Sequence, residues 1–357
     1  MPVIAAVDAH MVGQPSAGDA GNARFHTLLI QALMRTATDD DRVAALIAHE
    51  EARELIGGET PMTNVAAGNA RRLCRDIPQA LRDLSADAAV FSYIAPPRSP
   101  CPSVVVVHDV VFRLRPDWFS RRVRSLLNTM VPLSVRRAGA VVTVSERSRE
   151  DLVDAFDIDP SRVHVVPNIP APAFTPREDA AARVAERHGL YRYCLYVGDV
   201  HPRKNLVALA EAIRLVGDRD LRLAVVGRAG HQGEELIAAS GGMWLGPMGD
   251  EELADLYSAA AVTCYPSLYE GFGLPVVEAM ACGSPVVAAD RGAIPEVAGD
   301  AAILVEPYPA PIADGIRAAL EPMTADRLRE DGLRRAATFS PESMGAAGWA
   351  AIRAAVA

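Results

Sequence analysis

The sequence lacks the features that mark several large classes of protein. Its 357 residues carry a net charge of −9, which argues against a basic face for nucleic-acid phosphates. No apolar run approaches the roughly 20 residues that cross a bilayer, and the N-terminus MPVIAAVDAH has no basic start of a signal peptide. The five scattered cysteines form no Cys-x-x-Cys pair and no metal-ligand spacing. These absences predict a cytoplasmic globular protein with free thiols, no bound metal and no nucleic-acid partner.

Lysine is almost missing as well. Of the 36 basic residues one is lysine, Lys204, and the other 35 are arginine. An ammonium is a compact, rotatable point charge, whereas a guanidinium is a planar fork. We therefore expect position 204 to require the compact ammonium group of lysine rather than a guanidinium.

Apolar runs and amphipathic segments alternate along the whole chain. Runs such as SVVVVHD and SPVVAAD have no polar alternation, which is typical of strands buried on both faces of a parallel sheet. The pattern predicts an α/β protein with two Rossmann-like doubly wound parallel sheets facing across a cleft. Strands are predicted at residues 3–9, 42–48, 87–93, 103–109, 139–145, 194–199, 221–227, 261–267, 284–290 and 301–307.

The domain boundary is predicted in the stretch VVPNIPAPAFTP, residues 165–176, whose four prolines suit a stiff connector. We expect an N-terminal domain over residues 1–170, a C-terminal domain over 171–340, and a C-terminal helix over 341–357 that packs back on the N-terminal domain. Sites between such domains lie at the carboxyl ends of the strands.

The stretch VGDVHPRKNL is the first motif with chemical content. Gly198 ends a predicted strand and a helix pattern begins at Leu206, so Arg203 and Lys204 lie at a helix N-terminus. Unpaired backbone N–H groups there favour anions, and two cations at that end require a compensating negative charge. The loop is therefore predicted to bind phosphate, although basic loop residues are often only solvated. His201 is interpreted as a bystander.

The second motif is EGFGLPVVEAMACGSPVV, which follows the strand at 261–267. Pro275 suits the first turn of a helix and Gly283 its end. Gly271 and Gly273 allow the backbone to approach a ligand closely. Glu270 precedes the glycine loop, and Glu278 lies one turn into the helix.

These motifs resemble the retaining, GT-B-fold members of glycosyltransferase family 4, which carry a Glu-x7-Glu motif of this form. The stretches VVVVHDVVF, AVVTVSERSREDL and PEVAGDAAILVEP are similar to the same family, so the resemblance covers nearly the whole chain. One departure is PNIPA, where the family has PNGVD. The chain lacks the glycine after Asn168, and this affects only the detailed geometry expected for the hinge.

The resemblance implies a role for each matching residue. Gly198, Arg203 and Lys204 would bind the nucleotide diphosphate, and Glu270 would contact the donor sugar. Glu278 would bind the ribose hydroxyls, and His108 would face the sugar across the cleft. The remaining donor contacts would be Gly18 or Gly21 and the backbone of Gly271, Phe272, Gly273 and Leu274.

The implied reaction is retaining, metal-independent transfer of a hexose, with a preference for mannose from GDP-mannose. The acceptor would be a glycan, a lipid-linked or a small-molecule hydroxyl, and no cofactor is needed beyond the nucleotide-sugar substrate. The arginine-rich stretch at 113–137 is either a solvated helix pair or a peripheral contact with the inner face of the membrane.

Other classes make different predictions. A dinucleotide oxidoreductase would carry Gly-x-Gly-x-x-Gly after a strand, and VVGRAGHQG has the wrong spacing. A sugar-nucleotide epimerase shares the expected architecture and remains an alternative. A non-catalytic sugar-nucleotide-binding subunit is the third possibility.

Overall fold

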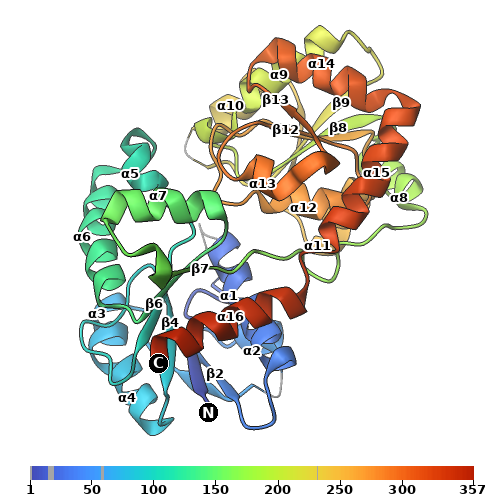
Figure 1. Cartoon of the computed structure of the whole chain (residues 1–357). Coiled ribbons are helices and arrows are strands. Elements are labelled where there is room, and N and C mark those ends of the chain that lie inside the picture. Colours follow the sequence, from blue (N-terminus) through green and yellow to red (C-terminus); the bar gives the residue numbers. More distant parts are fainter. Residues whose placement is uncertain (1, 15–19, 58–59, 231) are drawn as a thin grey trace. The chain divides into compact units, whose positions relative to one another are not determined.

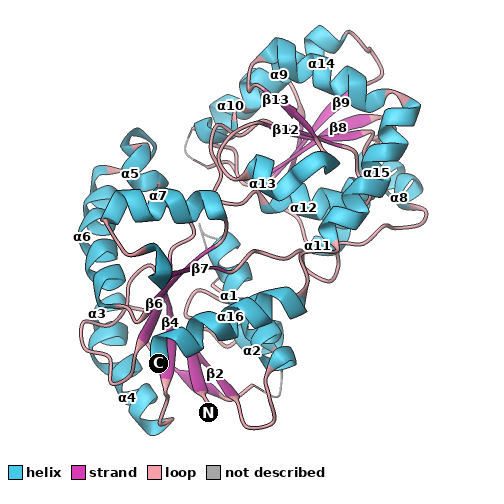
Figure 2. Ribbon diagram, in the orientation of Figure 1, coloured by secondary structure: helices cyan, strands magenta, loops and turns pink. Residues whose placement is uncertain are grey.

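The computed structural model describes residues 2–14, 20–57, 60–230 and 232–357, which form two compact units. Unit 1 comprises Met1–Ile169 and Ser340–Ala357, and unit 2 comprises Pro170–Phe339. Each unit is a parallel sheet covered by helices, as Figures 1 and 2 show. The predicted pair of doubly wound parallel sheets is confirmed. All five cysteines are free thiols.

The sheet of unit 1 has the strand order β3-β2-β1-β4-β5-β6-β7. Its strands are β1 Ile4–Asp8, β2 Arg42–Ile47, β3 Met62–Asn64, β4 Ala88–Ser92, β5 Ser103–Val106, β6 Ala140–Thr143 and β7 Val163–Val165. The central strands are buried on both faces because their residues are apolar throughout. The strand order reverses between β1 and β4, so a ligand site is expected at the carboxyl ends of these two strands.

Helices cover both faces of this sheet. They are α1 Ala20–Thr36, α2 Ala52–Ile56, α3 Asn69–Arg71, α4 Ile77–Asp83, α5 Val111–Leu114, α6 Arg121–Arg137, α7 Glu146–Phe156 and α16 Pro341–Val356. Between α3 and α4 the chain forms a π-helical turn, Arg72–Asp76. Such turns are rare and occur frequently at functional sites.

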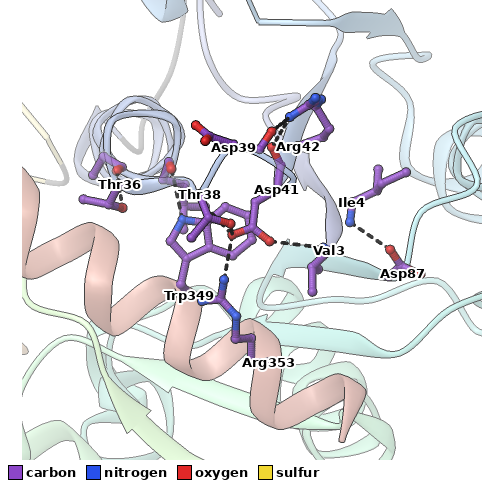
Figure 3. Close-up of polar contacts among 12 residues, drawn as sticks. Val3, Ile4, Thr36, Thr38, Asp39, Asp41, Arg42, Asp87, Trp349 and Arg353 are labelled. Atoms are coloured by element: carbon purple, nitrogen blue, oxygen red, sulfur yellow. Dashed lines mark hydrogen bonds and ion pairs between the residues drawn. The ribbon is translucent and has the colours of Figure 1, made fainter. Parts of the chain in front are cut away.

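The C-terminal helix α16 is part of unit 1 and packs beside α1 (Figure 1). Trp349 Nε1 donates to the carbonyl of Leu33 at 3.0 Å, and Arg353 Nη2 lies 2.6 Å from Asp41 Oδ2 (Figure 3). Asp41 also accepts from the backbone N–H of Val3 at 3.1 Å. Polar contacts therefore fix the last helix to the start of the first two strands. A Cβ on Gly345 would overlap α1, so the helices approach closely there.

The sheet of unit 2 has the order β10-β9-β8-β11-β12-β13. Its strands are β8 Tyr193–Val197, β9 Arg222–Val226, β10 Met243–Gly246, β11 Val262–Tyr265, β12 Val286–Ala289 and β13 Ile303–Val305. Its helices are α8 Ala180–His188, α9 Leu206–Val216, α10 Gly233–Ser240, α11 Asp250–Ala259, α12 Leu274–Ala281, α13 Ile294–Ala298, α14 Pro309–Leu320 and α15 Pro322–Ala336. Here the order reverses between β8 and β11. The loops after β8 and β11 are the two that carry the motifs of the sequence.

Candidate active site

The two motifs meet at the reversal point of the unit 2 sheet. Gly198 follows β8 in a positive-φ conformation (φ +144°), and a 3₁₀ turn, Pro202–Lys204, leads into α9. The side chain of His201 accepts from the backbone N–H of Arg203 at 3.1 Å and so shapes this turn. The loop after β11 carries Glu270 to the same place, because the carboxyl ends of adjacent parallel strands share one edge.

Lys204 is the centre of this cluster, and only 9% of its surface is exposed. Its Nζ donates to Tyr265 Oη at 2.5 Å and to Glu270 Oε1 at 2.7 Å. An ammonium has three N–H donors. Among the described residues the third donor has no partner. A Cβ built on Gly198 would lie 3.7 Å from Lys204 Cε, so the glycine loop covers the lysine side chain.

Glu270 supplies the negative charge that the two cations require. Its exposure is 6%, and Arg203 Nη1 lies 3.7 Å from Glu270 Oε2. Burial alone would raise the pKa of this carboxyl, but the charges of Lys204 and Arg203 outweigh it and hold the pKa at about 2. Glu270 is thus ionised at neutral pH. The sequence predicted a phosphate as the compensating anion, and the structure shows a carboxylate, that of Glu270, beside both cations.

The glycine loop after Glu270 leads into α12. Gly273 is the residue before the helix and has φ +97°, which favours glycine. Phe272 is buried and meets Phe339 edge to face, with ring centroids 5.5 Å apart. The loop is therefore anchored by the aromatic side chain of Phe272. Gly271 and Leu274 flank Phe272 and Gly273, and the loop backbone directly follows Glu270.

Glu278 lies inside α12 and is 3% exposed. Tyr257 Oη donates to Glu278 Oε2 at 3.2 Å. This contact joins the Glu278 carboxylate to Tyr257 of α11. The structure thus brings Arg203, Lys204 and Glu270 together and places Glu278 on the adjoining helix.

His108 belongs to unit 1, where it follows β5. Phe25 of α1 packs edge-on against its ring, with centroids 4.7 Å apart. Burial, and to a smaller extent the neighbouring His26, lower the pKa of His108 to about 3, so the imidazole is neutral at pH 7. The predicted position of His108 opposite the sugar stays a prediction.

Of the two glycines predicted in the N-terminal loop, Gly21 lies within the described residues. Gly18 lies outside the described residues. Gly21 is in the first turn of α1, and a Cβ built on it would meet open space. Packing therefore does not explain a glycine at position 21.

Sequence reasoning missed two residues that shape the cluster. Tyr265 ends β11 and contacts Lys204. In the sequence, its position in the strand before Glu270 was the one indication that it lies near the site. Gly292 has φ +57°, and a Cβ there would lie 2.5 Å from the carbonyl oxygen of Glu270. No local pattern links Gly292 with a loop 22 residues earlier in the chain.

Among the helices of the described residues, none has both the length and the apolar composition that a membrane span requires. Among the same residues, no three or more His, Cys, Asp or Glu side chains form a group that could hold a metal ion. The arginine-rich stretch forms α5 and α6, with Leu114, Val123, Leu126 and Leu133 exposed.

Two α/β units with parallel sheets, one of which carries a buried Lys–Glu pair beside a glycine loop, define the class of GT-B-fold enzymes. Family models agree with this class. The model described as "Glycosyl transferases group 1" matches residues 191–322, and "Glycosyltransferase Family 4" matches residues 46–169.

Individual relatives and structures point the same way. The chain is 32% identical to the O-antigen chain mannosyltransferase B of Escherichia coli over 68% of this chain and 67% of that protein. It is 38% identical to the MMP alpha-(1->4)-mannosyltransferase of Mycolicibacterium hassiacum over 59% of this chain and 53% of that one. Sucrose-phosphate synthase from Thermosynechococcus elongatus shares the fold, with a TM-score of 0.73, 20% identity and 96% coverage of both chains. Anabaena Alr3699/HepE in complex with UDP-glucose has a TM-score of 0.73 at 18% identity, covering 98% of each chain. The chain belongs to the glycosyltransferases and has their GT-B fold.

Proposed function

We propose that this glycosyltransferase moves a hexose from a nucleotide-diphosphate sugar to an acceptor hydroxyl with retention of configuration. The observation that carries the proposal is the buried Lys204, whose ammonium bonds to Tyr265 and Glu270 and has one donor without a partner among the described residues. A phosphate oxygen of the donor is the natural partner for that N–H. The helix N-terminus of α9 favours the same anion.

The charges account for the chemistry. As the bond between the anomeric carbon and the β-phosphate breaks, negative charge grows on the departing phosphate. Lys204 and Arg203 stabilise that charge, and fixed donors of this kind contribute several kcal/mol to lowering the barrier. They supply the positive charge that a divalent ion would otherwise supply, so we propose a metal-independent reaction without a cofactor. In front-face attack the acceptor oxygen bonds to the anomeric carbon as the bond to the phosphate oxygen breaks, and the hydroxyl proton passes to the departing phosphate, so no covalent nucleophile is needed.

The remaining site residues take the roles that the sequence suggested. Glu270 and the backbone of residues 271–274 contact the sugar, and Glu278 binds the ribose hydroxyls. Gly198, together with Gly18 or Gly21, allows the backbone to approach the phosphates. His108 is neutral, so it contacts the sugar as a hydrogen-bonding group without net charge.

The donor is proposed to be GDP-mannose. The names of the two mannosyltransferases that the chain resembles support mannose, while the name of the Anabaena complex keeps UDP-glucose as the competitor. The acceptor is a glycan, a lipid-linked or a small-molecule hydroxyl. Exposed leucines and arginines on α5 and α6 support a peripheral contact of residues 113–137 with the cytoplasmic face of a membrane.

A thermal-shift screen against GDP-mannose, UDP-glucose and the free diphosphates tests the donor site. A ligand at about 100 times its Kd adds roughly 2.7 kcal/mol of stability. The shift should be lost in Lys204→Ala and kept in Arg222→Ala, which removes an exposed cation of the same unit. No shift with any nucleotide or nucleotide sugar would contradict the proposal. Incubation with the donor alone excludes an epimerase if the sugar is not converted.

A further inference from the structure

Asn205 directly follows Lys204 and is the residue before helix α9. Its backbone has φ +59°, a left-handed conformation that glycine and asparagine adopt more readily than other residues. An asparagine at this place usually caps the helix with its side-chain oxygen, but here the side chain makes no such bond. The side chain of Asn205 is therefore available for contacts outside the helix.

The side-chain amide of Asn205 reaches two other loops. Nδ2 donates to the carbonyl of Pro266 at 3.2 Å and to the carbonyl of Pro307 at 2.9 Å. A carbonyl oxygen can only accept, so the atom that faces both prolines must be the amide nitrogen, which has one hydrogen for each. Pro266 follows β11 and Pro307 follows β13. One side chain thus joins the loops after β8, β11 and β13 at the carboxyl edge of the sheet.

A second hydrogen bond joins the loops after β8 and β11 on the other side of Lys204. The backbone N–H of Leu268 donates to the carbonyl of Arg203 at 2.9 Å. Lys204 therefore lies between two cross-links, one through Arg203 and one through Asn205. Its ammonium bonds to two oxygens of β11 and the loop that follows it. The distance between the two loops consequently decides where that ammonium lies.

The amide group accounts for asparagine at position 205. Pro266 and Pro307 are buried, and a buried carbonyl that loses its donor destabilises the folded state. Glycine would suit the positive φ equally well, but it would remove this donor from both carbonyls. Aspartate has nearly the same shape, and it would place a carboxylate oxygen against two carbonyl oxygens. Neither residue reproduces the cross-links that Asn205 makes.

We propose that Asn205 is a positioning residue of the donor site. Its amide holds the loop of Lys204 at a fixed distance from the loop of Glu270, and so fixes the point at which the ammonium meets the phosphate of the donor. The inference rests on the proposed function, which assigns that phosphate to Lys204. A displacement of about 1 Å in a catalytic group can cost about a hundredfold in rate, so a residue that does not touch the substrate can control activity.

The first test uses the fact that Lys204 is the one lysine of the chain. Labelling the full chain with ¹⁵Nζ-lysine therefore gives one side-chain ammonium signal in NMR, and no nucleotide is required. In wild type we expect this signal to be protected from exchange with water. In Asn205→Gly the exchange should become at least about tenfold faster, because the hydrogen bonds that oppose local opening are lost. Asn205→Asp should give a larger effect, since its carboxylate repels both carbonyl oxygens.

Asp179→Gly is the matched control. Asp179 has φ +56°, precedes helix α8 of the same unit and makes no side-chain cap bond. Its replacement by glycine is the same kind of change at the same kind of backbone position, before a different helix. The ammonium signal should be unchanged in this variant. Asn205→Gly is the deciding variant, because glycine adopts the required φ without strain and the protein should stay folded.

The second test compares the affinity of a nucleoside diphosphate with that of its nucleoside by calorimetry, using GDP with guanosine and UDP with uridine. Asn205→Gly should weaken binding of the diphosphate about tenfold, as expected for a displaced hydrogen bond to a charged group, and leave binding of the nucleoside unchanged. A general disturbance of unit 2 would weaken both equally. The ratio of the two affinities therefore reports on the phosphate-binding loop.

An ammonium signal that is the same in wild type, Asn205→Gly and Asn205→Asp would overturn the inference. An equal loss of diphosphate and nucleoside affinity would do so as well, and so would a diphosphate affinity that is unchanged while the ammonium signal changes. If wild type binds neither GDP nor UDP, the proposed function fails, and the ammonium signal still decides whether Asn205 positions Lys204. The two failures are therefore distinguishable.

Discussion

Replacing Lys204 by methionine tests whether the buried ion pair is as the structure has it. Methionine keeps the length and the apolar stem of the side chain and removes the ammonium. Glu270, with 6% of its surface exposed, then loses its 2.7 Å partner and keeps Arg203 at 3.7 Å. Removing one partner of a buried pair costs more than removing both, because an uncompensated charge remains.

The structure allows the size of the effect to be worked out. The pKa of Glu270 is about 2 in the folded protein, against 4.5 for an ordinary glutamate. At about 1.4 kcal/mol per pKa unit, this corresponds to about 3 kcal/mol of interaction with its surroundings. Buried pairs broken from one side typically lose about 3–5 kcal/mol. Part of that loss is offset by the remaining Arg203 and by the removal of the buried Lys204 ammonium, whose pKa is lowered by its burial. We therefore expect Lys204→Met to lower the free energy of unfolding of unit 2 by about 3 kcal/mol at pH 7.

A double-mutant cycle is the appropriate assay. The variants are Lys204→Met, Glu270→Gln and both together, unfolded in guanidinium chloride at pH 7. Hydrogen exchange of peptides from β8 and β11 assigns the transition to unit 2. The double variant should be more stable than the sum of the single losses predicts, with a coupling of about 2–3 kcal/mol. A cost below about 1 kcal/mol, or additive losses, would refute the buried pair.

The same pair predicts a pH dependence. Because the folded pKa of Glu270 is depressed, its stabilisation is complete above about pH 4.5 and is lost as the pH falls towards 2. The difference in unfolding free energy between wild type and Glu270→Gln should therefore shrink over that window. A difference that stays constant from pH 6 to pH 2.5 would mean that the carboxylate is not held by the two cations.

Three further predictions follow from single positions. Lys204→Arg should lower kcat/KM at least tenfold, because the planar fork misplaces the charge, and an unchanged value would remove the need for lysine. Gly292→Ala should cost about 2 kcal/mol or more in urea unfolding, since φ is +57° and the new Cβ meets the Glu270 carbonyl; a neutral effect would contradict that contact. Gly345→Ala should destabilise unit 1 by about 1–3 kcal/mol, measured against the exposed control Ala346→Ser, because its Cβ overlaps the Ala32 carbonyl in α1; equal stabilities would show that α16 can move away.

The sequence predicted the central strands and missed the edges of the sheets. Every predicted strand is present, whereas β3, β7 and β10 were not predicted, and each lies at the edge of a sheet. Central strands are buried on both faces and read as apolar runs. These three edge strands are three or four residues long, with the sequences MTN, VHV and MWLG. So short a segment has no period that distinguishes it from a loop.

In the candidate site, too, the local features could be predicted and the long-range contacts could not. Local motifs predicted which loops carry Arg203, Lys204 and Glu270, because each motif follows a recognisable strand. The partners of these residues come from distant parts of the chain, and sequence spacing does not encode those contacts. Tyr265 lies 61 residues from Lys204, and Arg72 lies 64 residues from Asp8. The ion pair of Asp8 and Arg72 was overlooked because its residues match no short pattern.

The solitary lysine can now be explained by the space around it. Lys204 is enclosed by Tyr265, Glu270 and the backbone at Gly198, and its ammonium reaches two oxygens at 2.5 and 2.7 Å. A guanidinium is wider and presents its donors in one plane, so it cannot meet both oxygens and keep a third N–H for another direction. Arg203 occupies the more open position, with its side chain 25% exposed, where a planar fork fits. A chain that uses arginine at 35 of its 36 basic positions thus keeps lysine where the charge must be compact and buried.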